Sequence, residues 1–290
     1  MKKVLTIAGS DSSGGAGIQA DLKAFSANGT FGMSAITAIT AQNTQGVWAV
    51  EDLSSSIIEA QIDAIFKDIE VDGVKIGMVS KIETIDVISE KLKEYKPKNV
   101  VLDPVMISKS GFDLLKPESK KALIENLIPL SSIITPNIPE ALAIIETYKH
   151  MYKDNDEYSE LLKEAETLTT IETREQMEMA AKIIHLIGAP NVLLKGGHLE
   201  DDAVDILYDG REFHYFEGER IHTKNTHGTG CTLSSTICAN LALGYSLAES
   251  IKRAKEYITE AIKHSLDIGH GVGPTNHFYN LYKKAGMLYE

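Results

Sequence analysis

The sequence predicts a single α/β domain whose parallel sheet is covered by helices on both faces. Short apolar runs alternate with amphipathic stretches of helical length, which is typical of strand-helix-strand units. A chain of 290 residues with 43% hydrophobic content can also bury one large core without a second domain. Five runs are predicted as buried strands, in chain order: Val4 to Ala8, Gly73 to Val79, Val100 to Met106, Ile133-Ile134 and Val192 to Leu194.

The helices and one hairpin between these strands have their own signals. Capping-box patterns predict helix starts at Ser56-Ile-Ile-Glu59, Thr173-Arg-Glu-Gln176 and Ser246-Leu-Ala-Glu249. Asp209-Gly210 separates Ala203 to Tyr208 from Arg211 to Glu217, which predicts an antiparallel hairpin.

One segment interrupts the alternation of strands and helices. Residues His150 to Thr170 are polar, charged and only weakly periodic. We expect a surface insertion at about 148–172 that is exposed and mobile, because few apolar residues are available to offset the entropy of ordering it.

Charge and cysteine content exclude several classes of protein. A net charge of −12 and a pI near 5.3 argue against nucleic acid or an anionic membrane as partner, since both require a basic surface. No run approaches the roughly 20 apolar residues of a membrane span, and the apolar stretch after Met1 is too short for a signal peptide. We therefore expect a cytoplasmic protein. Cys231 and Cys238 lie on one predicted helix, about 10 Å apart by helical rise, so both should be reduced thiols.

A glycine-spaced turn, Asn225 to Thr232, comes directly before the apolar helical run Leu233 to Leu243. The first N–H groups of a helix have no intrahelical partner, and the helix dipole favours an anion beside them. Gly228 and Gly230 would allow this backbone to approach a phosphate. The same field is expected to lower the pKa of Cys231. An ordinary turn followed by a buried cysteine is the simpler alternative.

Polar and charged residues follow the predicted strands, at the edge where open α/β sheets bind ligands. The loop Gly9 to Gly17 is rich in glycine but lacks the Gly-Lys-Ser/Thr ending of a Walker loop. Asp103 could hold a cation or cap a turn, and Asn137 with Glu140 could simply be an N-terminal cap. Lys195 supplies a positive charge beside two glycines.

Together these groups predict phosphoryl transfer. A kinase needs donors and a cation for the phosphates, acidic residues for magnesium and a group oriented on the attacking hydroxyl. Lys195, Asn137 and Thr229 are the residues expected at the nucleotide. Asp103 and Glu140 would hold Mg²⁺, in part through water, and Cys231 would act as the base.

Seven motifs in order resemble the hydroxymethylpyrimidine/phosphomethylpyrimidine kinases of thiamine biosynthesis, which are ribokinase-like. They are Gly9-Ser-Asp-Ser-Ser-Gly-Gly-Ala-Gly-Ile-Gln-Ala-Asp21, Thr40-Ala-Gln-Asn-Thr44, Lys75-Ile-Gly-Met78, Asp103-Pro-Val-Met106, Thr135-Pro-Asn-Ile-Pro-Glu140, Lys195-Gly-Gly-His198 and His227-Gly-Thr-Gly-Cys231. The resemblance extends from Val4 to His277.

This resemblance implies a three-layer α/β/α sandwich, a homodimer, and the use of ATP and Mg²⁺. The implied substrates are 4-amino-5-hydroxymethyl-2-methylpyrimidine and its monophosphate. Asp21, Gln42, Met78 and Val105 would surround the pyrimidine, and Cys231 would face its hydroxymethyl oxygen. The Gln42 amide can match an aminopyrimidine edge because it carries both a donor and an acceptor.

Three other functions remain open from the sequence. A pyridoxine or pyridoxal kinase would share the fold and the ATP site. A thiol hydrolase could use Cys231 with His227, but these residues lack an orienting third group and leave Lys195 unexplained. A catalytically silent nucleotide-binding protein is the third alternative.

Overall fold

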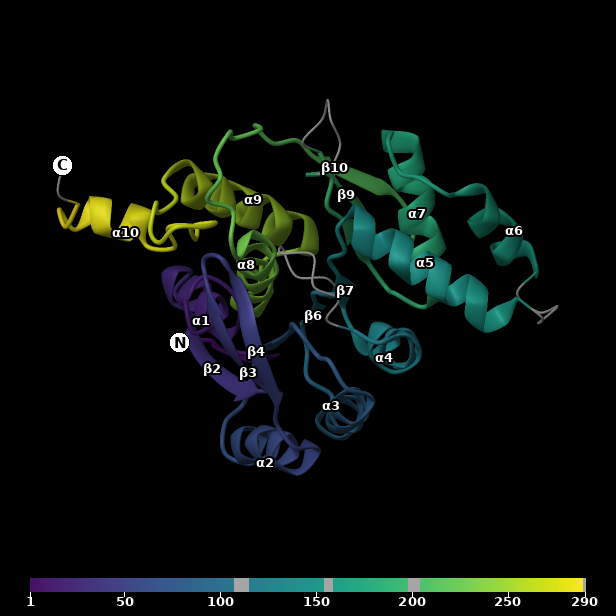
Figure 1. Ribbon diagram of the computed structural model, residues 1–290, viewed down its shortest axis with the longest axis horizontal. Helices are drawn as coiled ribbons and strands as arrows, with labels where there is room; N and C mark the ends of the chain where they lie inside the picture. The colour runs from purple at the N-terminus through teal and green to yellow at the C-terminus, as the bar shows by residue number, and fades with distance from the viewer. Residues whose placement is uncertain (107–114, 154–158, 198–203, 289–290) are drawn as a thin grey trace.

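The central sheet of the protein lies between two layers of helices, as the sequence predicts (Figure 1). The computed structural model describes residues 1–106, 115–153, 159–197 and 204–288. Helices α1, α8 and α9 cover one face, while α2 to α5 and α7 cover the other. The three-layer α/β/α architecture is therefore confirmed.

Within the described residues, the sheet has eight strands in the order β10-β9-β8-β7-β6-β5-β1-β2. All neighbouring pairs from β8 to β2 are parallel, and β9 and β10 form the predicted antiparallel hairpin at one edge. The strands are β1 Lys3–Ala8, β2 Phe31–Ile36, β5 Gly73–Ile76, β6 Val100–Leu102, β7 Ile133–Ile134, β8 Val192–Leu194, β9 Asp205–Tyr208 and β10 Phe213–Phe216.

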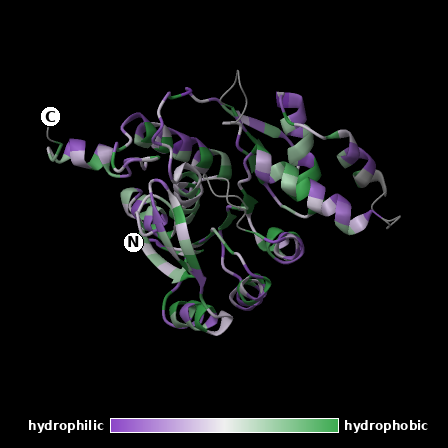
Figure 2. Ribbon diagram, viewed as in Figure 1, coloured by the Kyte–Doolittle hydropathy of each residue, from purple (hydrophilic) through white to green (hydrophobic). Residues whose placement is uncertain are grey.

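Consecutive residues of each central strand enter opposite cores because side chains alternate across a sheet. Leu5 and Ile7 of β1 belong to the core on the side of α2 to α5 and α7, whereas Val4 belongs to the core on the side of α1, α8 and α9. In Figure 2 the helices show mixed hydrophobic and hydrophilic surfaces, as expected for helices with one buried face. The helices are α1 Gly17–Ala27, α2 Ser55–Phe66, α3 Ile82–Tyr95, α4 Pro117–Ala122, α5 Ile138–Tyr152, α6 Ser159–Thr167, α7 Arg174–Ile187, α8 Thr229–Leu243, α9 Leu247–Lys263 and α10 Tyr279–Lys284.

Most predicted helix starts are confirmed. Thr173 forms a complete capping box with Gln176 before α7, and Ser246 caps α9 by accepting from the Glu249 N–H. The start predicted at Ser56 is wrong. Ser54 caps α2 instead, because its hydroxyl accepts from the Ile57 N–H.

Three strands were missed in the sequence: β2 and a separate two-stranded antiparallel sheet of β3 (Ala38–Asn43) and β4 (Gly46–Asp52). The strand β4 contains a short apolar run, Val47 to Val50, which was not recognised as a strand. Most of its side chains are exposed, unlike those of the buried strands. Residues of this small sheet form one wall of the site described below.

The predicted insertion is only partly as expected. The segment from His150 to Thr170 contains the end of α5 and the helix α6, and residues 154–158 lie outside the described part of the chain. Ala165 and Leu168 are buried, so the expectation of solvent exposure is wrong for this part. These apolar side chains anchor α6 beside α5 and α7. Across the described ranges, no helix has both the length and the apolar character that a membrane span requires.

Candidate active site

Two adjoining cavities lie at the carboxyl ends of the parallel strands. The first, of about 190 Å³, is lined by Gln42, Met78, Val105 and Cys231 among others. The second, of about 450 Å³, extends along α8 and α9 and reaches Arg220 and Ile262. Asn137, Lys195, Thr229 and Gly230 line both cavities. The two cavities therefore meet at the glycine turn and the charged strand ends.

The glycine turn forms the N-terminus of α8, as predicted. Gly228 is the N-cap and has a φ of 77°, a conformation that favours glycine. A Cβ atom at this position would also collide with the Gly15 carbonyl. A Cβ at Gly230 would lie 3.5 Å from Lys195 Nζ and 3.7 Å from Asp103 Oδ2. The open first turn of α8 and the Lys195 cation suit a phosphate group, whereas the Asp103 carboxylate would repel a phosphate unless a cation lay between them.

Lys195 joins the acidic residues predicted for magnesium. Its Nζ lies 3.2 Å from Asp103 Oδ1 and 3.9 Å from Glu140 Oε2. An isolated bridge between Asn137 and Lys195 brings the capping box of α5 beside the end of β8. Asp103 also accepts hydrogen bonds from the Thr135 and Ser234 hydroxyls.

These groups differ in their electrostatics. Burial raises the pKa of Glu140 to about 7; nearby Asp103 adds to this effect and Lys195 opposes it. Burial also opposes ionisation of Asp103, but the charges of Lys195 and Lys75 outweigh it and lower the pKa of Asp103. The pKa of Lys195 is raised, since its acidic neighbours outweigh the effect of burial. Asp103 is charged and Glu140 titrates near neutral pH, so the pair offers the hard oxygen donors that suit Mg²⁺ when Glu140 is ionised.

Asp21 does not lie where the sequence suggests. It is fully buried, does not line either cavity, and both of its oxygens are 2.9 Å from Lys75 Nζ. The Thr6 and Ser235 hydroxyls donate to the same carboxylate. Direct contact of Asp21 with a pyrimidine does not fit this position. Its partner Lys75 lines the first cavity and is a site residue that was not assigned from the sequence, although it begins one of the seven motifs.

The expected activation of Cys231 is also corrected. Burial raises the pKa of its thiol to about 11; the Lys75 charge opposes this rise, and the negative charges of Asp21 and Asp103 add to it. The thiol is therefore protonated at neutral pH, in spite of its place in the first turn of α8. Both cysteines are free thiols, as predicted, and Cys238 is fully buried in the core.

The first cavity is closed by side chains from distant parts of the sequence. Gln42 of β3 and Val47 and Val50 of β4 line it opposite Met78 and Val105. His227 Nε2 lies 2.7 Å from Asp11 Oδ2 and 3.3 Å from the Gln42 amide. Asp11 lies in the glycine-rich loop after β1 and was not assigned a role from the sequence. Asp11 could orient His227, but the high pKa of Cys231 argues against a thiol hydrolase.

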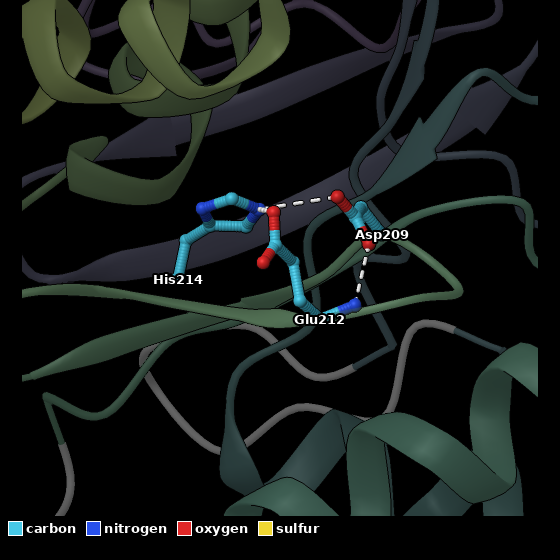
Figure 3. A group of neighbouring side chains, drawn as sticks. All are labelled: Asp209, Glu212 and His214. Atoms are coloured by element: carbon cyan, nitrogen blue, oxygen red, sulfur yellow. Dashed lines mark hydrogen bonds and ion pairs between the residues drawn. The ribbon is translucent and has the colours of Figure 1, made fainter.

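A third group of possible ligands lies on the β9-β10 hairpin (Figure 3). His214 Nε2 is 3.1 Å from Asp209 Oδ2 and 3.8 Å from Glu212 Oε1. Asp209 Oδ1 also accepts the backbone N–H groups of Arg211 and Glu212, so this carboxylate closes the hairpin turn. None of the three residues lines the two cavities. We interpret the group as a turn stabilised by hydrogen bonds to Asp209.

Comparison with known proteins shows the family to which this chain belongs. The family profile of phosphomethylpyrimidine kinase matches residues 11–164 and 161–276. The chain belongs to the phosphomethylpyrimidine kinase family. A hydroxymethylpyrimidine/phosphomethylpyrimidine kinase of Rhizobium meliloti is 48% identical over 282 residues, covering 96% of this chain and 98% of the relative. The chain also matches about half, 52%, of a bifunctional thiamine biosynthesis protein of Geobacter sulfurreducens at 48% identity.

Solved structures agree with this family. The crystal structure of a phosphomethylpyrimidine kinase from Clostridium difficile is 53% identical, with a TM-score of 0.76, and the match covers 91% of this chain and all of that one. A Bacillus subtilis pyridoxal kinase in complex with ADP is 41% identical, with a TM-score of 0.84 and coverage of 97% and 99%. The phosphomethylpyrimidine kinase fold is thus shared over nearly the whole chain, and the protein is a phosphotransferase.

Proposed function

We propose that this phosphomethylpyrimidine kinase transfers the γ-phosphoryl group of ATP to the hydroxymethyl group of 4-amino-5-hydroxymethyl-2-methylpyrimidine, and then to the monophosphate. The observation that carries the proposal is the meeting of two cavities at Lys195, Thr229 and Gly230. The smaller one suits a single substituted ring, and the longer one suits a nucleotide. A phosphoryl group at their junction would lie between the donor and the acceptor.

The residues at the junction have separate roles in this proposal. The open N–H groups at the start of α8 and Lys195 would neutralise the transferred phosphoryl group. Asp103 and Glu140 would hold Mg²⁺, which supplies further charge neutralisation when bound. Gly228 and Gly230 keep the backbone free of side chains at this point. Asn137 would meet the nucleotide side of the junction.

Cys231 contributes less to the reaction in this proposal than a strong general base would. Its thiol is protonated at neutral pH because burial raises its pKa to about 11. In a loose phosphoryl-transfer transition state the hydroxyl proton leaves late, so a weak base or an orienting group at this position suffices. Cys231 would then orient the hydroxymethyl group towards the phosphate.

The pyridoxal kinases are a second candidate, favoured by the structural match to the Bacillus subtilis enzyme. An assay of ADP release distinguishes the candidates. The pyrimidine alcohol, its monophosphate, pyridoxal and pyridoxine are supplied separately, and products are identified by mass. We expect the highest kcat/KM for the pyrimidine alcohol. ADP release with pyridoxal alone would replace the proposal with the second candidate, and no ADP release with any of them would favour a silent nucleotide-binding protein.

We further propose a cytoplasmic homodimer, as the family implies. Phe31 of β2 and Trp48 of β4 are 53% and 71% exposed, and a subunit interface over these aromatic side chains would remove them from water. Light scattering after size-exclusion chromatography measures the mass directly. A mass equal to the 31.7 kDa chain would contradict the dimer.

A further inference from the structure

His227 has no part in phosphoryl transfer as proposed above, yet it lines the first cavity, where the pyrimidine is proposed to bind. Its ring is held in place: the backbone forms an isolated bridge with Pro274, and the ring packs so closely on Gly15 that a Cβ there would collide with it. Nε2 faces Asp11 at 2.7 Å and the Gln42 amide at 3.3 Å. The direction of these hydrogen bonds decides what Gln42 can offer to a ligand.

Asp11 accepts hydrogen bonds and cannot donate one. Its two oxygens receive the Ser13 N–H at 2.9 Å, the Ser13 hydroxyl at 2.7 Å, the Gly15 N–H at 3.2 Å and the Ala16 N–H at 2.8 Å. The residue is only 2% exposed, and its hydrogen bonds and the charge of His227 hold its pKa well below the usual range despite burial. His227 must therefore carry a proton on Nε2, whether its ring is neutral or charged.

Thr40 gives an independent constraint on the other end of the same amide. Its Oγ1 lies 2.8 Å from the Ser10 carbonyl and 3.4 Å from the Gln42 amide. A hydroxyl has one proton, and the shorter contact to a carbonyl takes it. Thr40 can then only accept from Gln42.

We propose that Asp11 and His227 orient the Gln42 amide with its oxygen towards His227 and its NH₂ group towards Thr40 and the cavity. The opposite orientation, with nitrogen towards His227 as the structure places it, would set two donors against each other. In that orientation the amide oxygen would face Thr40, whose only hydroxyl proton is already donated to the Ser10 carbonyl. Amide nitrogen and oxygen are assigned from such networks, since the two atoms have nearly the same shape.

This orientation defines the substrate group that Gln42 recognises, provided that the proposed function holds. His227 has one proton on Nε2; Asp11 at 2.7 Å is the nearer acceptor, and the amide oxygen at 3.3 Å can only share this proton. The NH₂ group on the Thr40 side keeps an N–H for a ligand, so Gln42 presents a donor to the cavity. A donor selects an acceptor, and in an aminopyrimidine that acceptor is a ring nitrogen and not the exocyclic amino group. Asp11 and His227 are positioning residues for this selection.

Neutron diffraction of the protein without substrate tests the orientation directly. Deuterium on His227 Nε2 and on the Gln42 atom facing Thr40 is the expected result. Deuterium on the Gln42 atom facing His227 would overturn the proposal. This measurement needs no activity, so it decides the orientation even if the protein does not phosphorylate the pyrimidine, which would refute the proposed function alone.

Kinetics with two analogues, each with one ring nitrogen replaced by C–H, test the selection. We expect the wild type to lose roughly 10- to 100-fold in kcat/KM with one analogue. In His227→Phe the ratio of kcat/KM for the pyrimidine to kcat/KM for that analogue should fall to about threefold or less. This variant should have a higher KM for the pyrimidine and an unchanged KM for ATP. His227→Gln, which retains a side-chain N–H, should recover much of it, and His214→Phe on the exposed hairpin is the control. Full discrimination in His227→Phe would overturn the proposal.

Discussion

Replacing Glu140 with glutamine should make the protein more resistant to alkaline pH while it weakens magnesium binding. Burial raises the pKa of the Glu140 carboxyl to about 7 in the folded protein, against the reference value of 4.5 for an exposed carboxyl in an unfolded chain. The folded state therefore binds this proton more tightly. Its contribution to stability is complete below pH 4.5 and is lost as pH rises through 7.

The size of this effect follows from the two pKa values. Their difference corresponds to roughly 3 kcal/mol once the carboxyl is fully ionised, and between pH 5 and 8 the loss is roughly 2 to 3 kcal/mol. Glu140→Gln removes the titration but keeps an oxygen that can accept the Asn137 N–H, which Glu140 Oε2 accepts at 2.8 Å. The variant should lack this part of the pH dependence.

Urea unfolding at pH 5, 6, 7 and 8 in the presence of a chelator measures the difference. The free energy of unfolding of the wild type should fall relative to Glu140→Gln by roughly 2 to 3 kcal/mol over this range. Glu146→Gln is the matched control, since Glu146 lies on the same helix but its side chain is 56% exposed. Equal pH dependence of wild type and Glu140→Gln would show that the buried carboxyl ionises normally and would refute the reasoning.

Three further substitutions test the other parts of the site. Cys231→Ala should lower kcat by about tenfold with an unchanged KM for ATP, because the thiol is protonated and contributes only weakly. Cys238→Ala is the control. If Cys231→Ala has the same kcat as the wild type, Cys231 has no role in the reaction. Lys75→Met should destabilise the protein by roughly 3 to 5 kcal/mol in thermal unfolding, since it leaves the Asp21 carboxylate buried without its cation. Lys2→Met removes a lysine that is half exposed, so it should have little effect. Similar losses of stability in both variants would contradict this account. Gln42→Leu should raise KM for the pyrimidine roughly 10- to 100-fold and for pyridoxal less, and unchanged pyrimidine kinetics would show that Gln42 does not recognise the ring.

The sequence by itself determined the sheet and the edge that carries the site. Buried parallel strands are short and almost wholly apolar, so Val100 to Leu102 and Val192 to Leu194 stand out from the amphipathic helices between them. Residues that follow such strands must meet at one edge, which brought Asp103, Glu140 and Lys195 together in the prediction. The turn at Gly228 was also local, because an N-cap and a positive φ depend on neighbouring residues.

Only the tertiary structure decided how these residues are used. The charge state of Cys231 depends on burial and on Asp21, Lys75 and Asp103, which come from three other parts of the chain, so the local helix dipole did not determine it. Asp21 belongs to a motif at the site but pairs with Lys75, 54 residues away, beneath the cavity. Asp11 and His227 are 216 residues apart and meet only after the sheet and α8 have packed. Burial and hydrogen-bond direction depend on all surrounding elements at once, and for that reason no local pattern in the sequence reveals them.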